Sequence, residues 1–439
     1  VKRRALRWVF EDCPVGDYYE AALPGREAFC MRDTSHQAAG AEVLGLSRHN
    51  RNMLLKFARG ISKSRDWCSF WEIDRWDRPC PVDYENDSDF WYNLPANFDV
   101  LYACWRMYLW TGNRDYIEHP DFDRFYALST EAFVKVWDHD GDGIPDTAGE
   151  DYGRRGVAGY DESRFSRSRV ITAADTAAAL ARAYLSYAAM CSLRGRTEQE
   201  EIYRRKGTAL LDKLDREFYT EDHAYAYGLD KDRQLVYDVN EKQEIYVSPS
   251  AGLLYWDAIR DLDRIPRLLD RYAEQMPRAH IEGLSHYPEL QWRYGRDGEA
   301  LDSLRRLMDP ALPRKEYPEA SFCTVGAVAT GLMGIDPEAR ENRVATCPAL
   351  AGIAWAELNG VPVLGRLVSV FHRGGGSTVF SLDEGEGLVW RCRFRGRGKI
   401  SVRGRDTKTE PGIDVYTGGP YVYADIPVRP GESVEASLE

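Results

Sequence analysis

The sequence lacks any long apolar segment. No run of about 18 apolar residues, the length that a helix needs to cross a bilayer, occurs among the 439 residues. No membrane-spanning helix and no membrane partner are therefore expected. No signal peptide can be read either, although the sequence opens at Val1 in the middle of a pattern, so a cytoplasmic location is the expectation.

The sequence also lacks an excess of positive charge. It has 58 Lys and Arg against 70 Asp and Glu, a net charge of −12. Nucleic acids and anionic membrane surfaces attract basic proteins, so this balance argues against both as partners. Nothing in the sequence indicates the oligomeric state.

Paired cysteine motifs are absent as well. The nine Cys are scattered without a Cys-x-x-Cys pair or a regular spacing. This scatter predicts reduced, buried thiols in a reducing compartment and no zinc site.

Hydrophobic residues, in contrast, make up 44% of the chain, and they include 12 Trp beside 26 Tyr. Aromatic side chains fill protein cores, and they also form the flat faces on which sugar rings stack. The composition leaves both uses open.

Helical periodicity dominates as far as about residue 335. A first helix is expected from Thr34 or Ser35 to about Gly60, and a last one from Pro318 to Met333. Between them, helices come in pairs with short links: 94–110 with 116–137, 170–193 with 197–218, 248–260 with 265–275, and 286–294 with 299–308. A short link makes an antiparallel hairpin. Since each pair returns the chain to the same end, the long segments lie on one face, where a site is expected.

Five or six such hairpins can close into a ring of inner and outer helices. The predicted fold class is therefore mainly α, with an (α/α)6 barrel in residues 1–340. After about Ile335 the apolar residues alternate with period two, and glycine-rich turns separate the segments. This pattern predicts five to eight short antiparallel strands that form a β-sandwich in residues 341–439.

The segment 138–162 is a long acidic loop between two predicted helices. Asp138, Asp140 and Asp142 alternate before Gly143, with Asp146 beyond them. This resembles the first half of a calcium loop, in which alternating oxygens converge on the ion. Gly149 stands where an EF-hand has its last glutamate, so an EF-hand is excluded. The four aspartates predict a structural calcium ion; the alternative is an acidic turn whose side chains cap their own backbone.

The end of the same loop is the first candidate for catalysis. Glu150, Asp151, Tyr160, Asp161 and Glu162 bring carboxylates and an aromatic ring together. A carboxylic acid that protonates a glycosidic oxygen needs partial burial to raise its pKa. Asp161 or Glu162 is the preferred general acid, and the alternative is a solvated acidic loop paired with nearby arginines.

The start of the last helix carries two further carboxylates. Glu316 and Glu319 flank Pro318, on the face of the long loops. They are the candidates for the general base that activates water, and inversion requires about 6.5–9.5 Å between the two carboxyl groups. The favourable field at a helix N-terminus also explains a carboxylate here.

Several residues are expected to bind the substrate. Arg32 and Asp33 precede the first predicted helix and suit hydrogen bonds to sugar hydroxyls, or form a structural ion pair. Two aromatic and acidic loops, 67–92 and 281–292, fit the lining of a carbohydrate site, or ordinary packing. The other candidates from these loops and from the acidic loop are Trp71, Trp91, Tyr160, Glu282, His286 and Trp292. Glu282 and Glu289 are reserve candidates for the base, and His286 fits a hydrogen-bonding or core residue better than a catalyst.

The chain resembles the six-hairpin glycosidase superfamily, the glucoamylase-like (α/α)6 enzymes, over about residues 1–335. The pair Arg32 and Asp33 looks like the substrate-holding pair of that superfamily. The segment DHDGDGIPD followed by Tyr160 and Asp161 is similar to the acid-bearing loop of glucosylceramidase-like β-glucosidases, which implies Asp161 as the acid, although Glu162 replaces the usual aromatic residue.

The layout after the last helix (LMGI, then PAL and GVPVLGRLVSVFHR) is similar to that of α-L-rhamnosidases, whose acidic motif is not reproduced here. Together these features predict an exo-acting, inverting glycoside hydrolase with a carbohydrate as its partner. The expected substrate is a terminal sugar of an oligo- or polysaccharide, α-L-rhamnosyl as the first guess, or a glucosyl or uronyl residue. A polysaccharide lyase of the same fold and a non-catalytic carbohydrate-binding protein are the alternatives.

Overall fold

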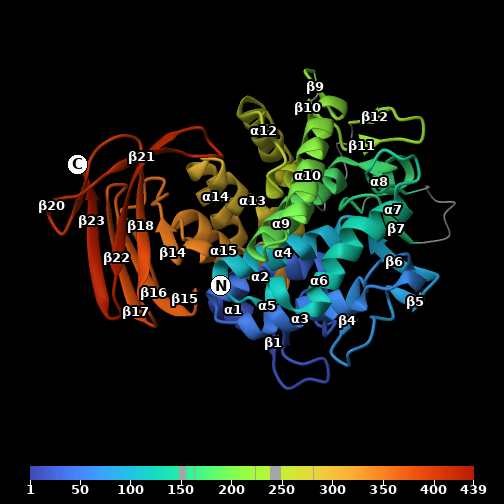
Figure 1. Ribbon diagram of the computed structural model, residues 1–439, viewed down its shortest axis with the longest axis horizontal. Coiled ribbons are helices and arrows are strands. Elements are labelled where there is room, and N and C mark those ends of the chain that lie inside the picture. The colour runs from blue at the N-terminus through green and yellow to red at the C-terminus, as the bar shows by residue number, and fades with distance from the viewer. Residues whose placement is uncertain (148–154, 163, 223, 238–248, 280) are drawn as a thin grey trace.

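The computed structural model describes residues 1–147, 155–162, 164–222, 224–237, 249–279 and 281–439. Helices take up 44% of the chain and strands 24%. A helical N-terminal part is followed by a C-terminal part made of β-sheets. The two parts lie side by side along the long axis of the molecule (Figure 1). The fold is thus mixed, with its two parts in the predicted order.

Six helices of the N-terminal part make a closed series of contacts. Each of the six contacts the member of this set that comes next in the sequence, and the last member, α15, contacts the first, α2. They are α2 Met31–Val43, α4 Ala96–Thr111, α9 Ala174–Leu193, α11 Pro249–Tyr255, α13 Ile281–Arg293 and α15 Pro318–Ala327. Every residue of α2 is buried, so this helix is enclosed on all sides.

Glycine permits the tightest of these contacts. A Cβ placed on Gly40 of α2 would lie 1.9 Å from the carbonyl oxygen of Phe322 in α15, and Gly326 of α15 faces Gly40 in turn. Any side chain at Gly40 would therefore push the two helices apart.

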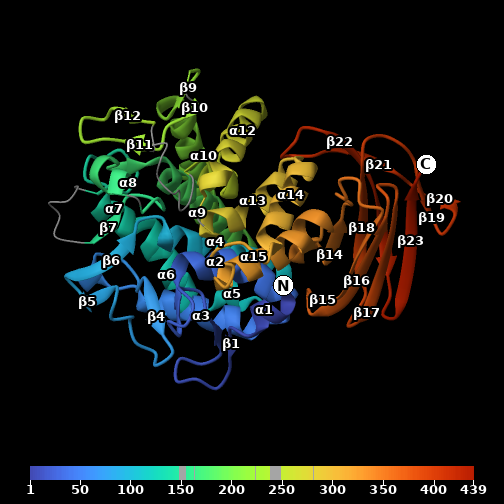
Figure 2. The same cartoon turned by 180° about the vertical axis from the view of Figure 1, so that it is seen from behind.

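Four of the six helices pack against a following helix of eleven or more residues (Figure 2). The pairs are α2 with α3 Ser47–Gly60, α9 with α10 Thr197–Glu217, α11 with α12 Ile265–Gln275, and α13 with α14 Asp297–Met308. After α4 the chain continues through α5 Asp115–Glu118, α6 Pro120–Ala127, the π-helical segment Leu128–Phe133 and α7 Val134–Trp137. The last of the six, α15, contacts the short α1 Lys2–Leu6.

The prediction of a single helix from residue 34 to 60 is wrong. Gly45 adopts φ +84° in a turn between α2 and α3, which splits the predicted helix in two. Helix α2 also begins at Met31, so Arg32 and Asp33 lie in its first turn and not before it. Similarly, α13 begins at Ile281 and not at His286, because its first turn buries polar residues that show no apolar periodicity.

The first turns of five of the six helices carry a buried acidic residue. These residues are Asp33 in α2, Asp99 in α4, Asp175 in α9, Glu282 in α13 and Glu319 in α15. Unpaired backbone N–H groups at a helix N-terminus stabilise negative charge. Carboxylates are therefore collected at this end.

Short strands cross the same end of the helices. Strand β3 Ala28–Cys30 pairs with β4 Glu72–Asp74, and β6 Asp89–Asn93 pairs with β5 Tyr84–Asn86 and, in parallel, with β7 Arg155–Val157. Strand β11 Gly228–Leu229 pairs with β8 Thr172–Ala173 and β12 Leu235–Val236. Two further hairpins join β1 Val9–Phe10 to β2 Tyr18–Tyr19 and β9 Tyr219–Thr220 to β10 Ala224–Tyr225. The predicted acidic loop thus contains β7, and the helix α8 Arg164–Arg169 follows it.

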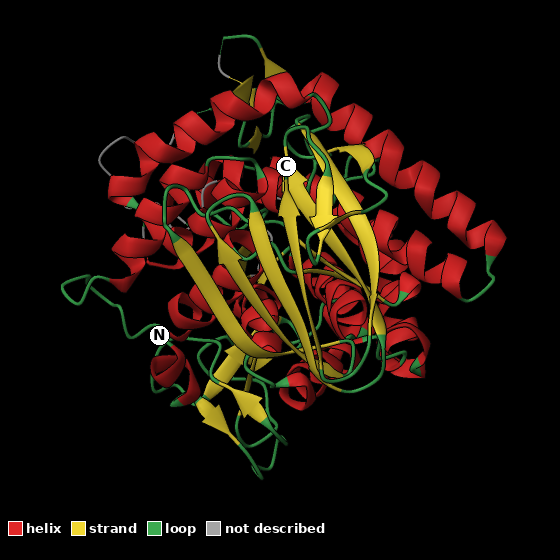
Figure 3. Ribbon diagram, turned by 90° about the vertical axis from the view of Figure 1, so that its left-hand side faces the viewer, coloured by secondary structure: helices red, strands yellow, loops and turns green. Residues whose placement is uncertain are grey.

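The C-terminal part consists of two sheets (Figure 3). One sheet has the order β13-β14-β18-β22-β21, with bounds Asp336–Glu338, Arg343–Thr346, Leu388–Arg395, Pro420–Val428 and Glu410–Ile413. The other has the order β15-β16-β17-β23-β19-β20, with bounds Trp355–Val363, Arg366–Arg373, Ser377–Glu384, Glu432–Leu438, Ile400–Val402 and Arg405–Asp406. Strands β14 and β18 pair in parallel, so the sheets are not wholly antiparallel. Phe380 and Trp390, one from each sheet, stack with ring centroids 5.2 Å apart in a shared core.

The same core extends into the helical part. It includes Val43 of α2, Trp110 of α4 and Trp292 of α13. The indole nitrogen of Trp110 donates to the carbonyl of Pro362 at 2.8 Å, and its own carbonyl accepts from the amide of Leu364 at 2.8 Å. The predicted boundary at residue 340 falls between β13 and β14, which pair with each other, and it stays a prediction.

None of the nine cysteines, all of which lie among the described residues, forms a disulfide, and seven of them are buried. Among the described residues, no helix is both long enough and apolar enough to cross a bilayer.

Candidate active site

One buried arginine is the centre of the candidate site. The guanidinium of Arg32 donates to Glu162 at 3.1 Å and to Glu282 at 2.8 Å, and its Nε lies 3.4 Å from Asp33. These carboxylates come from three separate segments: the first turn of α2, the loop that follows β7, and the first turn of α13. The fold therefore gathers residues that are up to 250 positions apart in the sequence.

Aromatic and polar side chains hold this group in place. Arg32 lies over the rings of Tyr160 and Trp71, at 5.5 and 5.8 Å from their centroids. Asn93, at the end of β6, donates to Glu162 at 3.0 Å, and the hydroxyl of Tyr317 donates to Asp33 at 2.7 Å. The Glu162 side chain is 25% exposed, whereas those of Arg32 and Glu282 are each 6% exposed. Glu162 is thus the member of the group that solvent reaches.

The electrostatics favour a neutral carboxyl in this group. Burial raises the pKa of Glu282 from 4.5 to about 8, although the charge of Arg32 opposes the shift. Burial, together with the charge of Glu319, raises the pKa of Asp33 to about 6. A single guanidinium does not compensate three negative charges, two of which are buried, so a proton stays on Glu282 at neutral pH.

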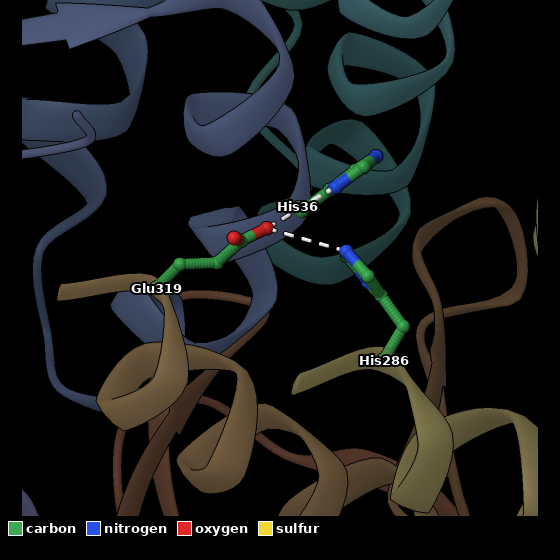
Figure 4. Close-up of side chains that lie close together, drawn as sticks. All are labelled: His36, His286 and Glu319. Atoms are coloured by element: carbon green, nitrogen blue, oxygen red, sulfur yellow. Dashed lines mark hydrogen bonds and ion pairs between the residues drawn. The ribbon is translucent and has the colours of Figure 1, made fainter. Parts of the chain in front are cut away.

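A second group lies one helical turn deeper. His36 follows Arg32 by four residues in α2, and His286 follows Glu282 by four residues in α13, so each histidine lies beneath a member of the first group. Glu319 of α15 lies between them: its Oε1 is 3.3 Å from His36 Nδ1 and 3.3 Å from His286 Nε2 (Figure 4). The other ring nitrogen of His36 lies 3.1 Å from Asp99, which accepts the hydroxyl of Tyr160 at 2.8 Å.

Charges are divided unequally within this second group. Burial would raise the pKa of Glu319, but the two imidazoles outweigh it and lower that pKa to about 2. Burial would lower the pKa of His36, but Asp99 and Glu319 raise it to about 9. Burial and the charge of His36 lower the pKa of His286. In the absence of other ions, His36 is therefore the protonated partner of Glu319, and His286 is neutral.

Most of the predicted site residues lie in these two groups or in contact with them. They are Arg32, Asp33, Trp71, Tyr160, Glu162, Glu282, His286 and Glu319. Their catalytic and binding roles stay predictions. Asp161 lies between Tyr160 and Glu162 in the sequence and is buried. Burial raises the pKa of Asp175 to about 6, and the neighbouring Asp161 contributes to this increase.

Three predicted site residues lie elsewhere. Glu316 has a side chain that is 46% exposed and pairs with Arg7 of the chain start. Trp292 is buried in the core shared with the sheets, against Gly331. Trp91 is half-buried on β6, with Arg167 at 6.0 Å from its ring centroid. The candidates Glu150 and Asp151 lie outside the described residues.

The predicted calcium loop brings three of its four aspartates together. Oxygens of Asp138, Asp140 and Asp146 lie within 4.8 Å of one another. Asp142 is directed elsewhere and pairs with Lys213 at 3.0 Å and Arg233 at 2.9 Å. The side chains of Asp138, Asp140 and Asp142 also accept backbone N–H groups of their own turn, at 2.9 to 3.1 Å. Both alternatives of the sequence analysis, a calcium loop and a self-capped acidic turn, therefore remain compatible with this geometry.

Four residues of the site were not identified from the sequence as site residues: His36, Asn93, Asp99 and Tyr317. The spacing of four between Arg32 and His36 was the available signal, because it places both on one side of a helix. Glu289, a reserve candidate, lies deeper still and pairs with Arg106 and Arg293, each at 2.9 Å. These cations outweigh its burial and lower its pKa to about 2, so it is a structural anion.

No protein-family model matches the sequence. No curated protein matches it either. Among solved structures, the chain is similar to an alpha-L-rhamnosidase from Dictyoglumus thermophilum, with a TM-score of 0.62 and 12% identity over 93% of this chain and 46% of that chain. It is also similar to a putative kojibiose phosphorylase from the human microbiome, with a TM-score of 0.55 and 7% identity over 97% of this chain and 60% of that one.

A GH78 family rhamnosidase of Bacillus sp. GL1 has a TM-score of 0.52 and 13% identity, over 84% of this chain and 42% of that one. The chain thus spans less than two thirds of each of these proteins. At such low identities the likeness shows the fold alone, which is six-hairpin glycosidase-like.

Proposed function

We propose that this chain is a glycoside hydrolase that cleaves a terminal, uncharged sugar with the carboxyl groups of Glu282 and Glu162. The observation that carries the proposal is the convergence of Asp33, Glu162 and Glu282 on the buried Arg32. Hydrolysis of a glycosidic bond needs a carboxylic acid and a carboxylate on either side of it. This group supplies both.

Glu282 is proposed as the general acid. Its raised pKa of about 8 keeps the proton on the carboxyl at neutral pH, which is the state needed to protonate a leaving oxygen. Glu162 is proposed as the base. It is the more exposed carboxylate, so a water molecule reaches it from solvent, and Arg32 and Asn93 fix its orientation. Direct attack by that water would invert the anomeric centre.

The surrounding scaffold is proposed to be an (α/α)6 barrel with an appended β-sandwich. The closed contacts of α2, α4, α9, α11, α13 and α15 support an inner ring, and α3, α10, α12 and α14 support an outer one. The first turns of the inner helices would then form the mouth, where the carboxylates gather.

The charge balance supports an uncharged substrate. Three carboxylates surround one buried guanidinium, and Arg314, which lies 3.9 Å from Glu282, is exposed. A uronate or another anionic sugar would meet repulsion that a neutral sugar avoids. The alternative of a lyase is disfavoured because burial and Asp99 raise the pKa of Tyr160 well above its ordinary value, which makes its phenol a poor base.

The experiment compares substrates with good and poor leaving groups. A panel of neutral aryl glycosides, with uronides as a comparison, first identifies the sugar, and NMR of the released anomer gives the stereochemistry. Glu282→Gln should lower kcat/KM by about 10²- to 10⁴-fold on a glycoside with a poor leaving group and far less on its dinitrophenyl analogue. Glu162→Gln should lower kcat/KM for both glycosides.

The matched control is Glu131→Gln, which changes an exposed glutamate paired with Lys206 on the outer surface; it should leave both rates unchanged. Equal losses with both leaving groups in Glu282→Gln would remove Glu282 from the role of acid. An unsaturated product would favour the lyase, and a rate that requires inorganic phosphate would indicate phosphorolysis. Sugar binding without turnover in the unmutated protein would favour the non-catalytic alternative.

A further inference from the structure

Two imidazoles and one carboxylate meet beneath the proposed sugar site. His36 of α2, His286 of α13 and Glu319 of α15 each direct one donor atom at the others, and these atoms lie within 4.8 Å of one another (Figure 4). We propose that His36 Nδ1, His286 Nε2 and Glu319 bind a divalent transition-metal ion, with zinc as the ion that best fits the donors.

The donor spacing agrees with tetrahedral coordination. Glu319 Oε1 lies 3.3 Å from each of the two ring nitrogens. In a tetrahedral zinc site with bonds of about 2.0–2.1 Å, neighbouring donor atoms lie roughly 3.3–3.4 Å apart. The two rings are nearly perpendicular, at 88°, with centroids 4.3 Å apart, so they approach the shared point from different directions.

The chemistry of the donors agrees as well. Two histidines and one glutamate form a known three-residue zinc set, and imidazole favours zinc and its neighbours over calcium or magnesium. A metal-binding histidine commonly has its other ring nitrogen against a carboxylate, which fixes its tautomer. His36 meets this condition, because its Nε2 lies 3.1 Å from Asp99, and Asp99 is itself oriented by the hydroxyl of Tyr160.

Buried polar atoms in this cluster lack hydrogen bonds. Within the described part of the chain, Glu319 Oε2 has no hydrogen-bond partner, and the one contact of His286 Nε2 is the 3.3 Å contact with Glu319 Oε1; the two residues are only 0% and 6% exposed. Leaving such atoms unsatisfied costs stability. A metal ion would coordinate the nitrogen of His286.

A divalent ion would also balance the local charge. Asp99 and Glu319 bring two carboxylates into a region of zero exposure. A protonated His36 compensates one of them, whereas a divalent cation bound to neutral imidazoles compensates both.

The expectation of no zinc site was based on the cysteines alone, and none of them takes part here. The proposal is independent of the proposed hydrolysis, because metal content is measured without a substrate. It does conflict with Glu319 as a catalytic base, since a carboxylate bound to an ion is not free to activate water.

The test measures metal in protein that carries no histidine tag. After dialysis against metal-free buffer, elemental analysis should find about one zinc or related ion per chain. Replacement by Co²⁺ should give the visible absorption of a tetrahedral site, and a strong chelator should lower the Tm, with added zinc restoring it.

His286→Gln should lower zinc affinity by more than about tenfold. Its matched control is His139→Gln, which removes an exposed histidine that pairs with Asp146 within the acidic loop and should keep the ion. Wild-type protein that retains no ion, gives no tetrahedral cobalt spectrum and does not respond to zinc would overturn the proposal even if His286→Gln failed to fold. Equal metal content in His286→Gln and wild type would overturn it too.

Discussion

The protonation of Glu282 can be tested through stability, without any substrate. In the folded protein burial raises its pKa from 4.5 to about 8. Between these pH values the folded protein holds a proton that the unfolded chain releases, so stability falls as pH rises through this window. At 1.36 kcal/mol per pKa unit, the shift corresponds to a loss of at most about 5 kcal/mol.

Glu282→Gln replaces the carboxyl with a neutral group of the same shape. The variant should match the wild type near pH 5, where Glu282 is protonated in the folded protein. It should be the more stable protein at pH 9, by up to about 5 kcal/mol, because the wild type must then bury an extra negative charge. Urea unfolding followed by tryptophan fluorescence at pH 5, 7 and 9 measures the difference.

Glu289→Gln is the matched control. Glu289 lies on the same helix and its side chain is 16% exposed, but Arg106 and Arg293 overcome the effect of burial and lower its pKa to about 2. This variant should be less stable than the wild type throughout the range above pH 4.5, by about 3–5 kcal/mol, since it leaves two arginines without their partner. Parallel pH profiles for the wild type and Glu282→Gln would refute the reasoning, because they would mean that Glu282 is ionised in the folded protein.

Three further predictions concern activity, packing and the acidic loop. If Glu282 is the general acid, kcat/KM should decline above about pH 8 as the carboxyl loses its proton, and Glu282→Gln should lack this basic limb. Gly40→Ala should destabilise the fold by about 3 kcal/mol in thermal unfolding, because its Cβ would meet the Phe322 carbonyl, whereas Gly298→Ala, in an open helical position of α14, should stabilise it by about 1 kcal/mol. Calcium should raise the Tm of the wild type but not of Asp138→Asn; equal responses of the two proteins would exclude a calcium ion held by Asp138, Asp140 and Asp146.

The helices could be predicted from the sequence wherever an apolar stripe faces a core. The pairs α9 with α10 and α13 with α14 were predicted from such stripes and from their short links. Where a helix begins with buried polar residues, the stripe is missing. The first turns of α2 and α13 were therefore read as loops, although Arg32 and Glu282 lie in them.

The site was predictable only in part for the same reason. Acidic residues at segment ends pointed to Glu162, Glu282 and Glu319. No sequence signal shows that the first turns of α2 and α13 come close in space, so the contact of Arg32 with Glu282 could not be foreseen. The exposed position of Glu316 follows from its pairing with Arg7 near the chain start, a tertiary contact that local sequence does not encode.

The anchoring of Trp110 to Pro362 and Leu364 has a consequence for how the protein can be divided. Helix α4 carries Asp99 in its first turn and Trp110 near its C-terminal end. Its N-terminal end therefore lies at the proposed catalytic site, and its C-terminal end contacts the sheets. Truncation near residue 336 would leave Val43, Trp110 and Trp292 facing water. The sheets therefore stabilise the helical part. An engineered fragment without them would need other apolar residues to bury the surface formed by Val43, Trp110 and Trp292.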